Sequence, residues 1–302
     1  MISGSYLAGR LGMTRASVWK HIKALQAEGF PIKTRKASGY GLTLPYDFSL
    51  LKGEASRGLR FWKVHYQLSA TSTQTLAKYA AEQGTAEGNL WIAEKQTAGR
   101  GRLERQWESG LGGLWMSLLL RPAIAPSWIP SLTLVSALSL VEAIQSETRL
   151  PVRLKWPNDV VVKTAKGWRK VAGILTEMSA EIDRTRWVVI GIGANVNNPL
   201  SPALVDRAAS LSALLDRPLN RASLLKAYLS RFGSAYRRFE KVGFDAFRQA
   251  YWHHYSRPDE PVQLKTAQGH VRGIARGVDA RGALLVESHN QTKSIWEGEI
   301  VL

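Results

Sequence analysis

The stretch EKQTAGRGRLERQW, residues 94–107, has the residue types and spacing best suited to chemistry. Gly99 and Gly101 carry no Cβ, so the backbone there can take a positive φ and approach a ligand closely. The same stretch contains three arginines, Arg100, Arg102 and Arg105. Their guanidinium donors match carboxylate and phosphate oxygens in bidentate geometry. This composition predicts a loop that wraps an anion, with a solvated basic turn or a non-specific nucleic-acid contact as the alternative.

Two predicted strands flank this loop and must position it. Residues 90–93 alternate in the manner of a strand, and residues 114–120 form a second apolar run. A glycine-rich segment between two such runs is typical of a connecting loop. The residues ahead of the first strand, Thr71 to Glu82, predict a helix that ends at Gly84.

Two further motifs follow downstream, KWPND at residues 155–159 and KVAGILTE at residues 170–177. Taken together, GRGRxxRxW, KWPND and KxAGILxE resemble the motifs of the bacterial bifunctional biotin protein ligases, which also act as repressors of the biotin operon. The order and spacing are similar, and the resemblance spans nearly the whole chain. It implies an α+β fold with three parts: an N-terminal winged helix-turn-helix, a central mixed-sheet ligase domain like those of class II synthetases and lipoate ligases, and a C-terminal SH3-like β-barrel.

The resemblance also implies a reaction. Biotin and ATP, with Mg²⁺, would form biotinyl-5′-AMP, and a lysine of the biotin carboxyl carrier protein of acetyl-CoA carboxylase would then take the biotin. The alternatives are a lipoate-type ligase and a biotin-sensing transcription regulator without ligase activity. The GRGR loop with Trp107 favours the biotin branch, and the presence of Lys170 argues against a lost activity.

By resemblance, each motif residue is expected to have a role. The catalytic residues are Lys170 and Arg102. The biotin-binding residues are Ser72, Thr73, Gln74, Gln96, Arg100, Gly101, Arg102, Lys170 and Gly173. The ATP-binding residues are Arg105, Trp107, Lys155, Asn158 and Asp159. Gln74 stands where the family has Asn, which weakens that contact, and Asn158 and Asp159 would orient Lys155 or a Mg²⁺ ion on ATP. No protein side chain is assigned to the metal itself.

Composition limits the other possibilities. The chain of 302 residues has no cysteine, which excludes thiolate catalysis, disulfides and cysteine-based zinc sites. No run of 18 apolar residues occurs, which argues against a membrane span. A cytoplasmic protein is therefore expected. The net charge of +17 favours polyanionic partners such as nucleic acid, nucleotide or acidic protein.

Residues 1–46 predict a DNA-binding module. A helix from Ser3 to Leu11, with Tyr6, Leu7 and Leu11 on one face, precedes a second helix capped by Thr14 and a basic hairpin. The residues expected to contact DNA are Arg15, Ser17, Lys20, His21, Lys33 and Arg35. Compared with the family, the first helix of this module is missing. We expect weak operator binding as numbered, restored by extending the reading frame upstream by about 12–15 residues.

The sequence as a whole predicts four parts: the DNA-binding module at residues 1–46, a linker at 47–58, a catalytic domain at 59–256 and a C-terminal domain at 259–302. Within the catalytic domain, residues 155–163 and 170–178 predict the two strands of a hairpin. The run GIGAN at residues 191–195 lacks the third glycine and the helix of a dinucleotide site. Four short strands are expected after residue 260, at 262–265, 271–277, 283–287 and 294–296. The family also implies a homodimer, formed through the central sheet when the adenylate is bound.

Overall fold

The computed structural model describes residues 1–27, 30, 32–36, 38–42, 48, 61–289 and 291–301. The chain separates into two compact units, residues 1–49 and 50–302. The predicted linker at 47–58, apart from Phe48, lies outside the described residues, as do the first two residues of the catalytic domain predicted at 59–256.

The N-terminal unit is a helix-turn-helix followed by a hairpin. Its elements are α1 (Gly4–Leu11), α2 (Arg15–Ala27), β1 (Ile32–Arg35) and β2 (Gly39–Leu42). The hydroxyls of Ser3 and Thr14 accept hydrogen bonds from the backbone N–H groups of Tyr6 and Ser17, both at 3.1 Å, and so cap the two helices. β1 and β2 pair antiparallel, which forms the expected wing.

The apolar face expected on α1 is largely open to solvent. Ala8 and Val18 are the buried residues of the helix pair, whereas Tyr6 and Leu11 are each 58% exposed. No element within the described part of the N-terminal unit covers these two side chains. The residue spacing predicted the helix correctly, but spacing cannot tell which apolar positions find a partner.

The second unit contains a seven-stranded mixed sheet in the order β3-β4-β5-β9-β8-β7-β6. Its strands are β3 (Lys63–Ala70), β4 (Asn89–Gln96), β5 (Leu114–Leu120), β6 (Arg153–Lys155), β7 (Asp159–Thr164), β8 (Gly167–Ala180) and β9 (Thr185–Ala194). β3 and β4 are parallel, and every other neighbouring pair is antiparallel. The single strand predicted at 155–163 is wrong: it divides into β6 and β7. Pro157 has no N–H to continue the ladder, so the chain turns there.

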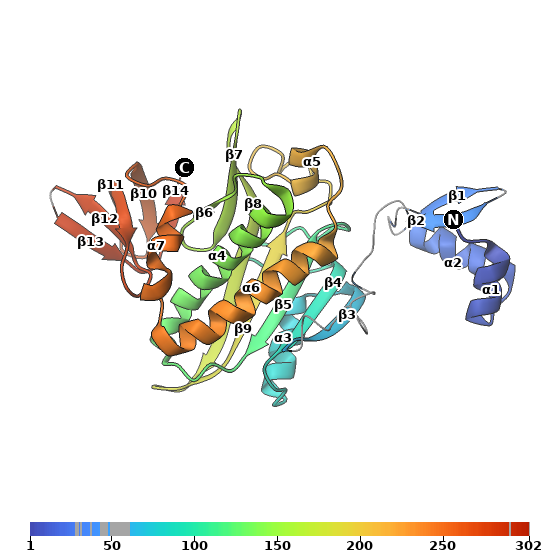
Figure 1. The fold of residues 1–302 in the computed structure, drawn as a ribbon, viewed down its shortest axis with the longest axis horizontal. Coiled ribbons are helices and arrows are strands. Elements are labelled where there is room, and N and C mark those ends of the chain that lie inside the picture. The colour runs from blue at the N-terminus through green and yellow to red at the C-terminus, as the bar shows by residue number, and fades with distance from the viewer. Residues whose placement is uncertain are drawn as a thin grey trace. The chain divides into compact units, whose positions relative to one another are not determined.

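Helices cover both faces of this sheet. Ala77 and Ala81 of α3 (Thr73–Glu82) pack on Trp91, Leu119 and Val189. On the other face, α4 (Ile129–Thr148) and α6 (Arg221–Val242) pack against each other across the sheet, as Figure 1 shows. Two shorter helices, α5 (Leu211–Leu215) and α7 (Asp245–His253), complete the helical elements after β9.

Helix α4 forms the centre of the core. The segment Pro126–Thr148, which includes the short 3₁₀ helix η3 (Pro126–Trp128), is long and apolar enough to cross a membrane, but 78% of its most apolar window is buried inside the protein. It is hydrophobic on nearly all sides because the sheet and α6 surround it.

The C-terminal part is a five-stranded antiparallel sheet in the order β13-β12-β11-β10-β14. Its strands are β10 (Pro261–Thr266), β11 (Gly269–Val278), β12 (Leu284–Ser288), β13 (Gln291–Ile295) and β14 (Glu299–Val301). Four of them match expected strands, whereas β14 was missed because three residues are too few to show an alternating pattern.

The turn between β11 and β12 fastens this C-terminal part to the catalytic sheet. The buried indole N–H of Trp156 donates to the carbonyl of Gly282 at 3.1 Å. A Cβ at Gly282 would lie 2.5 Å from Leu134, and φ there is +90°, so glycine fits where another residue would clash. Beside it, the Arg281 guanidinium lies 5.1 Å from the Trp128 ring and 5.4 Å from the Trp296 ring.

Candidate active site

A pocket of about 1120 Å³ opens on the sheet face that carries α3, between the glycine-rich loop and the C-terminal part. Its walls come from the loop, from β6 to β9, and from β10 and β14. It brings together every residue predicted to bind biotin or ATP: Ser72, Thr73, Gln74, Gln96, Arg100, Gly101, Arg102, Arg105, Trp107, Lys155, Asn158, Asp159, Lys170 and Gly173. Their individual roles stay predictions.

The deep end of the pocket is polar but uncharged. Gln96 Oε1 accepts from the Thr73 N–H at 2.7 Å and from the Thr73 hydroxyl at 3.1 Å. The Gln96 amide donates to Ser109 Oγ at 2.8 Å. Ser117 Oγ lies 2.9 Å from the Thr73 hydroxyl. Thr73, Ser109 and Ser117 are buried, Gln96 is partly exposed, and each of the four is hydrogen-bonded to another, which fixes their positions.

The segment before α3 also reaches this deep end. Ser72 occupies the N-cap position, but its side chain makes no capping hydrogen bond. Gln74 is buried, and its amide donates to the Val189 carbonyl at 3.3 Å. A Cβ on Gly191 would lie 2.4 Å from Gln74 Oε1, so this glycine makes room for the longer side chain at position 74.

The glycine-rich loop folds back on itself as a short hairpin. The N–H of Gly101 donates to the Arg105 carbonyl at 2.7 Å, and the N–H of Trp107 donates to the Gly99 carbonyl at 2.9 Å. At the tip, Leu103 and Glu104 have φ values of +55° and +57°. These residues are uncommon in the left-handed region, so the tip is backbone under strain.

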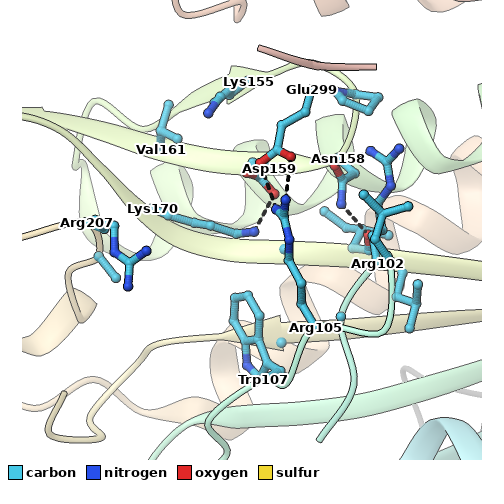
Figure 2. Close-up of a pocket in the computed structure, with 18 of the residues that line it drawn as sticks. Arg102, Arg105, Trp107, Lys155, Asn158, Asp159, Val161, Lys170, Arg207 and Glu299 are labelled. Carbon is cyan, nitrogen blue, oxygen red and sulfur yellow. Dashed lines mark hydrogen bonds and ion pairs between the residues drawn. The ribbon is translucent and has the colours of Figure 1, made fainter. Parts of the chain in front are cut away.

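Each arginine of the loop has a hydrogen-bond or ion-pair partner within the protein. Arg100 pairs with Glu104 at 3.1 Å, and Arg102 donates to Asn158 Oδ1 at 3.0 Å. Arg105 makes a bidentate pair with Glu299, with both N–O distances at 2.8 Å (Figure 2). These partners are carboxylate or amide oxygens, the same kind of acceptor that an anionic ligand would offer.

A second group of cations lines the opposite wall. Lys170 Nζ lies 2.6 Å from Asp159 Oδ1, and both side chains are partly exposed (Figure 2). Burial lowers the pKa of Lys155 below its usual value, against the opposing effect of the Asp159 carboxylate. Asp159 was expected to orient Lys155 or a metal ion, and its ion pair is with Lys170. Figure 2 also shows Arg207, from the segment before α5, beside Lys170 in the pocket.

Trp107 forms an aromatic wall between the two ends. Its ring lies 5.0 Å from Lys170 Nζ, and its indole N–H has no hydrogen-bond partner within the described residues. A Cβ on Gly193 would lie 2.5 Å from the Trp107 indole nitrogen, and one on Gly173 would lie 3.0 Å from Lys170 Nζ. These glycines, Gly173 on β8 and Gly193 on β9, therefore make room for the Lys170 and Trp107 side chains.

A buried ion pair connects the strand before the loop to helix α6. Glu94, two residues before Gln96 on β4, lies 2.8 Å from the Arg221 guanidinium of α6, and the two side chains are 0% and 1% exposed. Arg221 also donates to the Gly113 carbonyl at 2.8 Å, where the chain leaves the loop. The Tyr66 hydroxyl donates to Glu94 at 3.1 Å. The sequence analysis missed this pair.

The residues expected to contact DNA lie on the N-terminal unit. Arg15, Lys20 and His21 on α2 and Lys33 and Arg35 on β1 are exposed, and Ser17 is intermediate.

Three protein-family models match successive parts of the chain. The Biotin/lipoate A/B protein ligase family matches residues 65–195, and the Biotin protein ligase C terminal domain matches residues 259–302. An HTH domain matches residues 1–41. The fold and the pocket thus define a protein ligase of the biotin and lipoate class with a helix-turn-helix domain at its N-terminal end.

Individual relatives narrow this class. The bifunctional ligase/repressor BirA of Bacillus subtilis (strain 168) is 37% identical over 310 residues, which cover 100% of this chain and 94% of that protein. The Escherichia coli (strain K12) protein of the same name is 30% identical, covering 99% and 92%. Biotin protein ligase from Aquifex aeolicus, solved in complex with biotin and ATP, has a TM-score of 0.69 and 30% identity over 79% of this chain and 97% of that one. The chain belongs to the bifunctional biotin ligase/repressors.

Proposed function

We propose that this pocket activates biotin with ATP to biotinyl-5′-AMP and then transfers biotin to a lysine of a biotin carboxyl carrier protein. The observation that carries the proposal is the division of the pocket into two ends. Its deep end is buried, neutral and rich in hydrogen-bonding groups, whereas its mouth contains partly exposed cations beside an aromatic ring. Biotin with an adenylate has the matching order: a neutral ureido ring, a reacting carboxyl group and a phosphate beside a purine.

The deep end distinguishes biotin from lipoate. A ureido ring offers N–H donors and a carbonyl acceptor, while the dithiolane ring of lipoate offers neither. The deep end contains Ser72 without a capping bond, together with the hydrogen-bonded Thr73 and Gln96. Burying polar groups against a ligand that cannot hydrogen-bond to them is unfavourable, since unsatisfied groups cost about 1–3 kcal/mol each. The deep end therefore favours biotin.

The mouth supplies the charges that adenylation requires. The attacking carboxylate and the α-phosphate are both anionic, so donors fixed around them lower the barrier. Lys170 lies against Trp107 and so stands at the junction of the two ends, where the activated carboxyl group would form. Arg102 holds the biotinyl part of the adenylate, Arg105 holds the phosphates, and Trp107 packs on the purine.

Magnesium would arrive with the nucleotide. Within the described residues, no cluster of three or more histidine, cysteine or acidic side chains could hold a metal ion. Magnesium commonly takes one or two carboxylates together with substrate phosphates, and Asp159 lines the pocket as one such carboxylate. The bound ion would neutralise phosphate charge, while the cations of this chain position the reacting oxygens.

The glycine-rich loop would close over the adenylate. A mixed anhydride hydrolyses in water, so a lid that excludes solvent protects it until the acceptor lysine arrives. The loop arginines would exchange Glu104, Asn158 and Glu299 for ligand oxygens or share them. An anionic ligand therefore selects the closed loop by differential binding.

The experiment is transfer of labelled biotin to a carrier domain in the presence of ATP and Mg²⁺. The carrier whose acceptor lysine is replaced by arginine is the control, and labelled lipoate is the competing substrate. We expect ATP-dependent labelling with biotin and none of the lysine-free carrier. Labelling with lipoate in preference to biotin would contradict the proposal.

A second role as repressor of the biotin operon is supported by the HTH match over residues 1–41. We propose that Arg15, Ser17, Lys20, His21, Lys33 and Arg35 contact operator DNA. In this arrangement the cytoplasmic, adenylate-bound protein dimerises through β3, the edge strand of its sheet, and presents two helix-turn-helix units. The domain division at residues 1–46, 47–58, 59–256 and 259–302 belongs to the same proposal.

Gel-shift titrations at two salt concentrations, with and without biotin and ATP, test the repressor role. Phosphate contacts release counterions, so affinity should fall steeply as salt rises. The double substitution Lys20→Ala and Arg35→Ala should flatten that dependence. Salt-independent binding, or binding that ignores biotin and ATP, would contradict the role.

A further inference from the structure

The bidentate pair of Arg105 and Glu299 joins two segments that lie 194 positions apart in the sequence. Arg105 is on the returning arm of the loop hairpin, and Glu299 begins β14 of the C-terminal part. Both guanidinium Nη atoms donate to separate carboxylate oxygens at 2.8 Å, as Figure 2 shows. The pair therefore bridges the loop to a different domain of the protein at the pocket mouth.

The two partners differ in how firmly the fold holds them. Glu299 is fixed by its strand, because β14 pairs with β10 through Lys265 opposite Glu299. The C-terminal part is itself anchored by the buried bond from Trp156 to Gly282. Arg105, by contrast, follows a hairpin tip whose two central residues are strained and exposed. The backbone at Glu299 is therefore fixed by the sheet, whereas the position of Arg105 depends more on its ion pair.

We propose that Glu299 is a positioning residue, which holds Arg105 over the pocket mouth so that the guanidinium is already placed when the nucleotide binds. The inference rests on the proposed function, in which Arg105 contacts the phosphates. A guanidinium has five N–H donors, and Glu299 uses two of them, so three are left for phosphate oxygens. Holding the side chain in advance removes ordering cost from the binding step.

The electrostatics are consistent with a permanent pair. The hydrogen bond from Arg105 holds the pKa of Glu299 below its usual range, so the carboxylate is ionised at neutral pH. The opposite behaviour is also physically possible, since a carboxylate at this place would compete with phosphate for the same guanidinium. The two behaviours predict changes of opposite sign when the carboxylate is removed.

The test compares Glu299→Gln with Glu297→Gln in biotin-dependent pyrophosphate exchange. Glu297 lies two residues away on the same rim, is exposed, and has no ion pair among the described residues, so its substitution removes the same charge without breaking a pair. We expect Glu299→Gln to raise KM for ATP about two- to fivefold, the range for exposed ion pairs, with kcat little changed. Glu297→Gln should leave KM within error, and Glu299→Asp should recover part of the loss. A KM lowered by Glu299→Gln would overturn the proposal in favour of competition.

A double-mutant cycle with Arg105→Gln tests whether Glu299 acts through Arg105. In the Arg105→Gln background, Glu299→Gln should produce no further rise in KM. An equal rise in both backgrounds would show that Glu299 acts elsewhere, and the proposal would be wrong.

A ligand-free measurement separates this inference from the proposed function. Trypsin cleaves after Arg100 and Arg102, and mass spectrometry of the fragments gives the cleavage rate within the loop. Without any substrate, Glu299→Gln should speed loop cleavage about two- to fivefold, and Glu297→Gln should not. Equal rates in the wild type and both variants would refute the positioning role, whether or not the protein ligates biotin.

Discussion

Two ion pairs support the same loop, and their surroundings are opposite. The side chains of Glu94 and Arg221, in the core of the catalytic domain, are 0% and 1% exposed. The side chains of Arg105 and Glu299, at the pocket mouth, are 62% and 46% exposed. Both pairs connect segments that are far apart in the sequence. The buried pair has no access to solvent or ligand, whereas the exposed pair lies at the mouth of the pocket.

The difference separates charges that hold the fold from charges that serve a ligand. A buried pair leaves an uncompensated charge in the interior if one partner is removed, so it behaves as a permanent part of the core. An exposed pair costs little to break, because water replaces the lost partner. Arg100 and Arg105, two of the cations proposed to meet biotin and ATP, form pairs of the second kind, with acceptors that a ligand can replace or share.

The largest effect is expected from Arg221→Met. This change leaves Glu94 charged and buried, and the loss in the free energy of unfolding should be about 3–5 kcal/mol. Chemical denaturation of the variant measures it, with Arg237→Met, an exposed position on the same helix, as the control. The double variant Arg221→Met with Glu94→Leu should lose less than the single one. A loss below about 1 kcal/mol for Arg221→Met would place the pair among the weak surface contacts.

Lys170→Ala should affect catalysis and spare the fold. Removing one preorganised donor from the adenylation site typically raises the barrier by about 2.7–4 kcal/mol, so pyrophosphate exchange should fall about 100- to 1000-fold. Lys163→Ala, an exposed lysine on β7 outside the pocket, is the control. Unchanged exchange in a folded Lys170→Ala variant would show that this lysine merely faces solvent.

Arg102→Gly should release the intermediate. Loss of a charge-assisted hydrogen bond costs about 1.5–3 kcal/mol, so the adenylate should dissociate more readily and acylate lysines on bystander proteins. The measurement is the amount of labelled biotin attached to an unrelated protein that is mixed with the carrier. Retention of the intermediate and labelling of the carrier alone, as in the wild type, would show that Arg102 does not hold the adenylate.

The sequence predicted which residues share the pocket, but it did not predict the contacts that support them. All residues assigned to ligands line one pocket, because short motifs fix their local geometry. The supports depend on distant contacts that no spacing reveals. Arg221 begins a helix over a hundred positions after Glu94, and Glu299 lies on a three-residue strand. Pro157 was a readable signal that the strand expected at 155–163 would break.

The smallest effect is expected for Glu299→Gln on stability. An exposed pair contributes about 0–1 kcal/mol to the free energy of unfolding, far below the buried one. Chemical denaturation of Glu299→Gln and Arg221→Met under the same conditions compares their losses in the free energy of unfolding. A loss as large as that of Arg221→Met would erase the distinction between the two pairs.

Hydrogen exchange of the wild type compares the two regions in one measurement. A bound ligand should order the region of the exposed pairs and leave the region of the buried pair unchanged. Exchange should be measured for peptides covering residues 99–107 and residues 89–95, without ligand and with biotin, ATP and Mg²⁺. We expect ligand to slow exchange in 99–107, while 89–95 is protected in both states. Protection of 99–107 equal to that of 89–95 before any ligand is added would contradict this difference between the two regions.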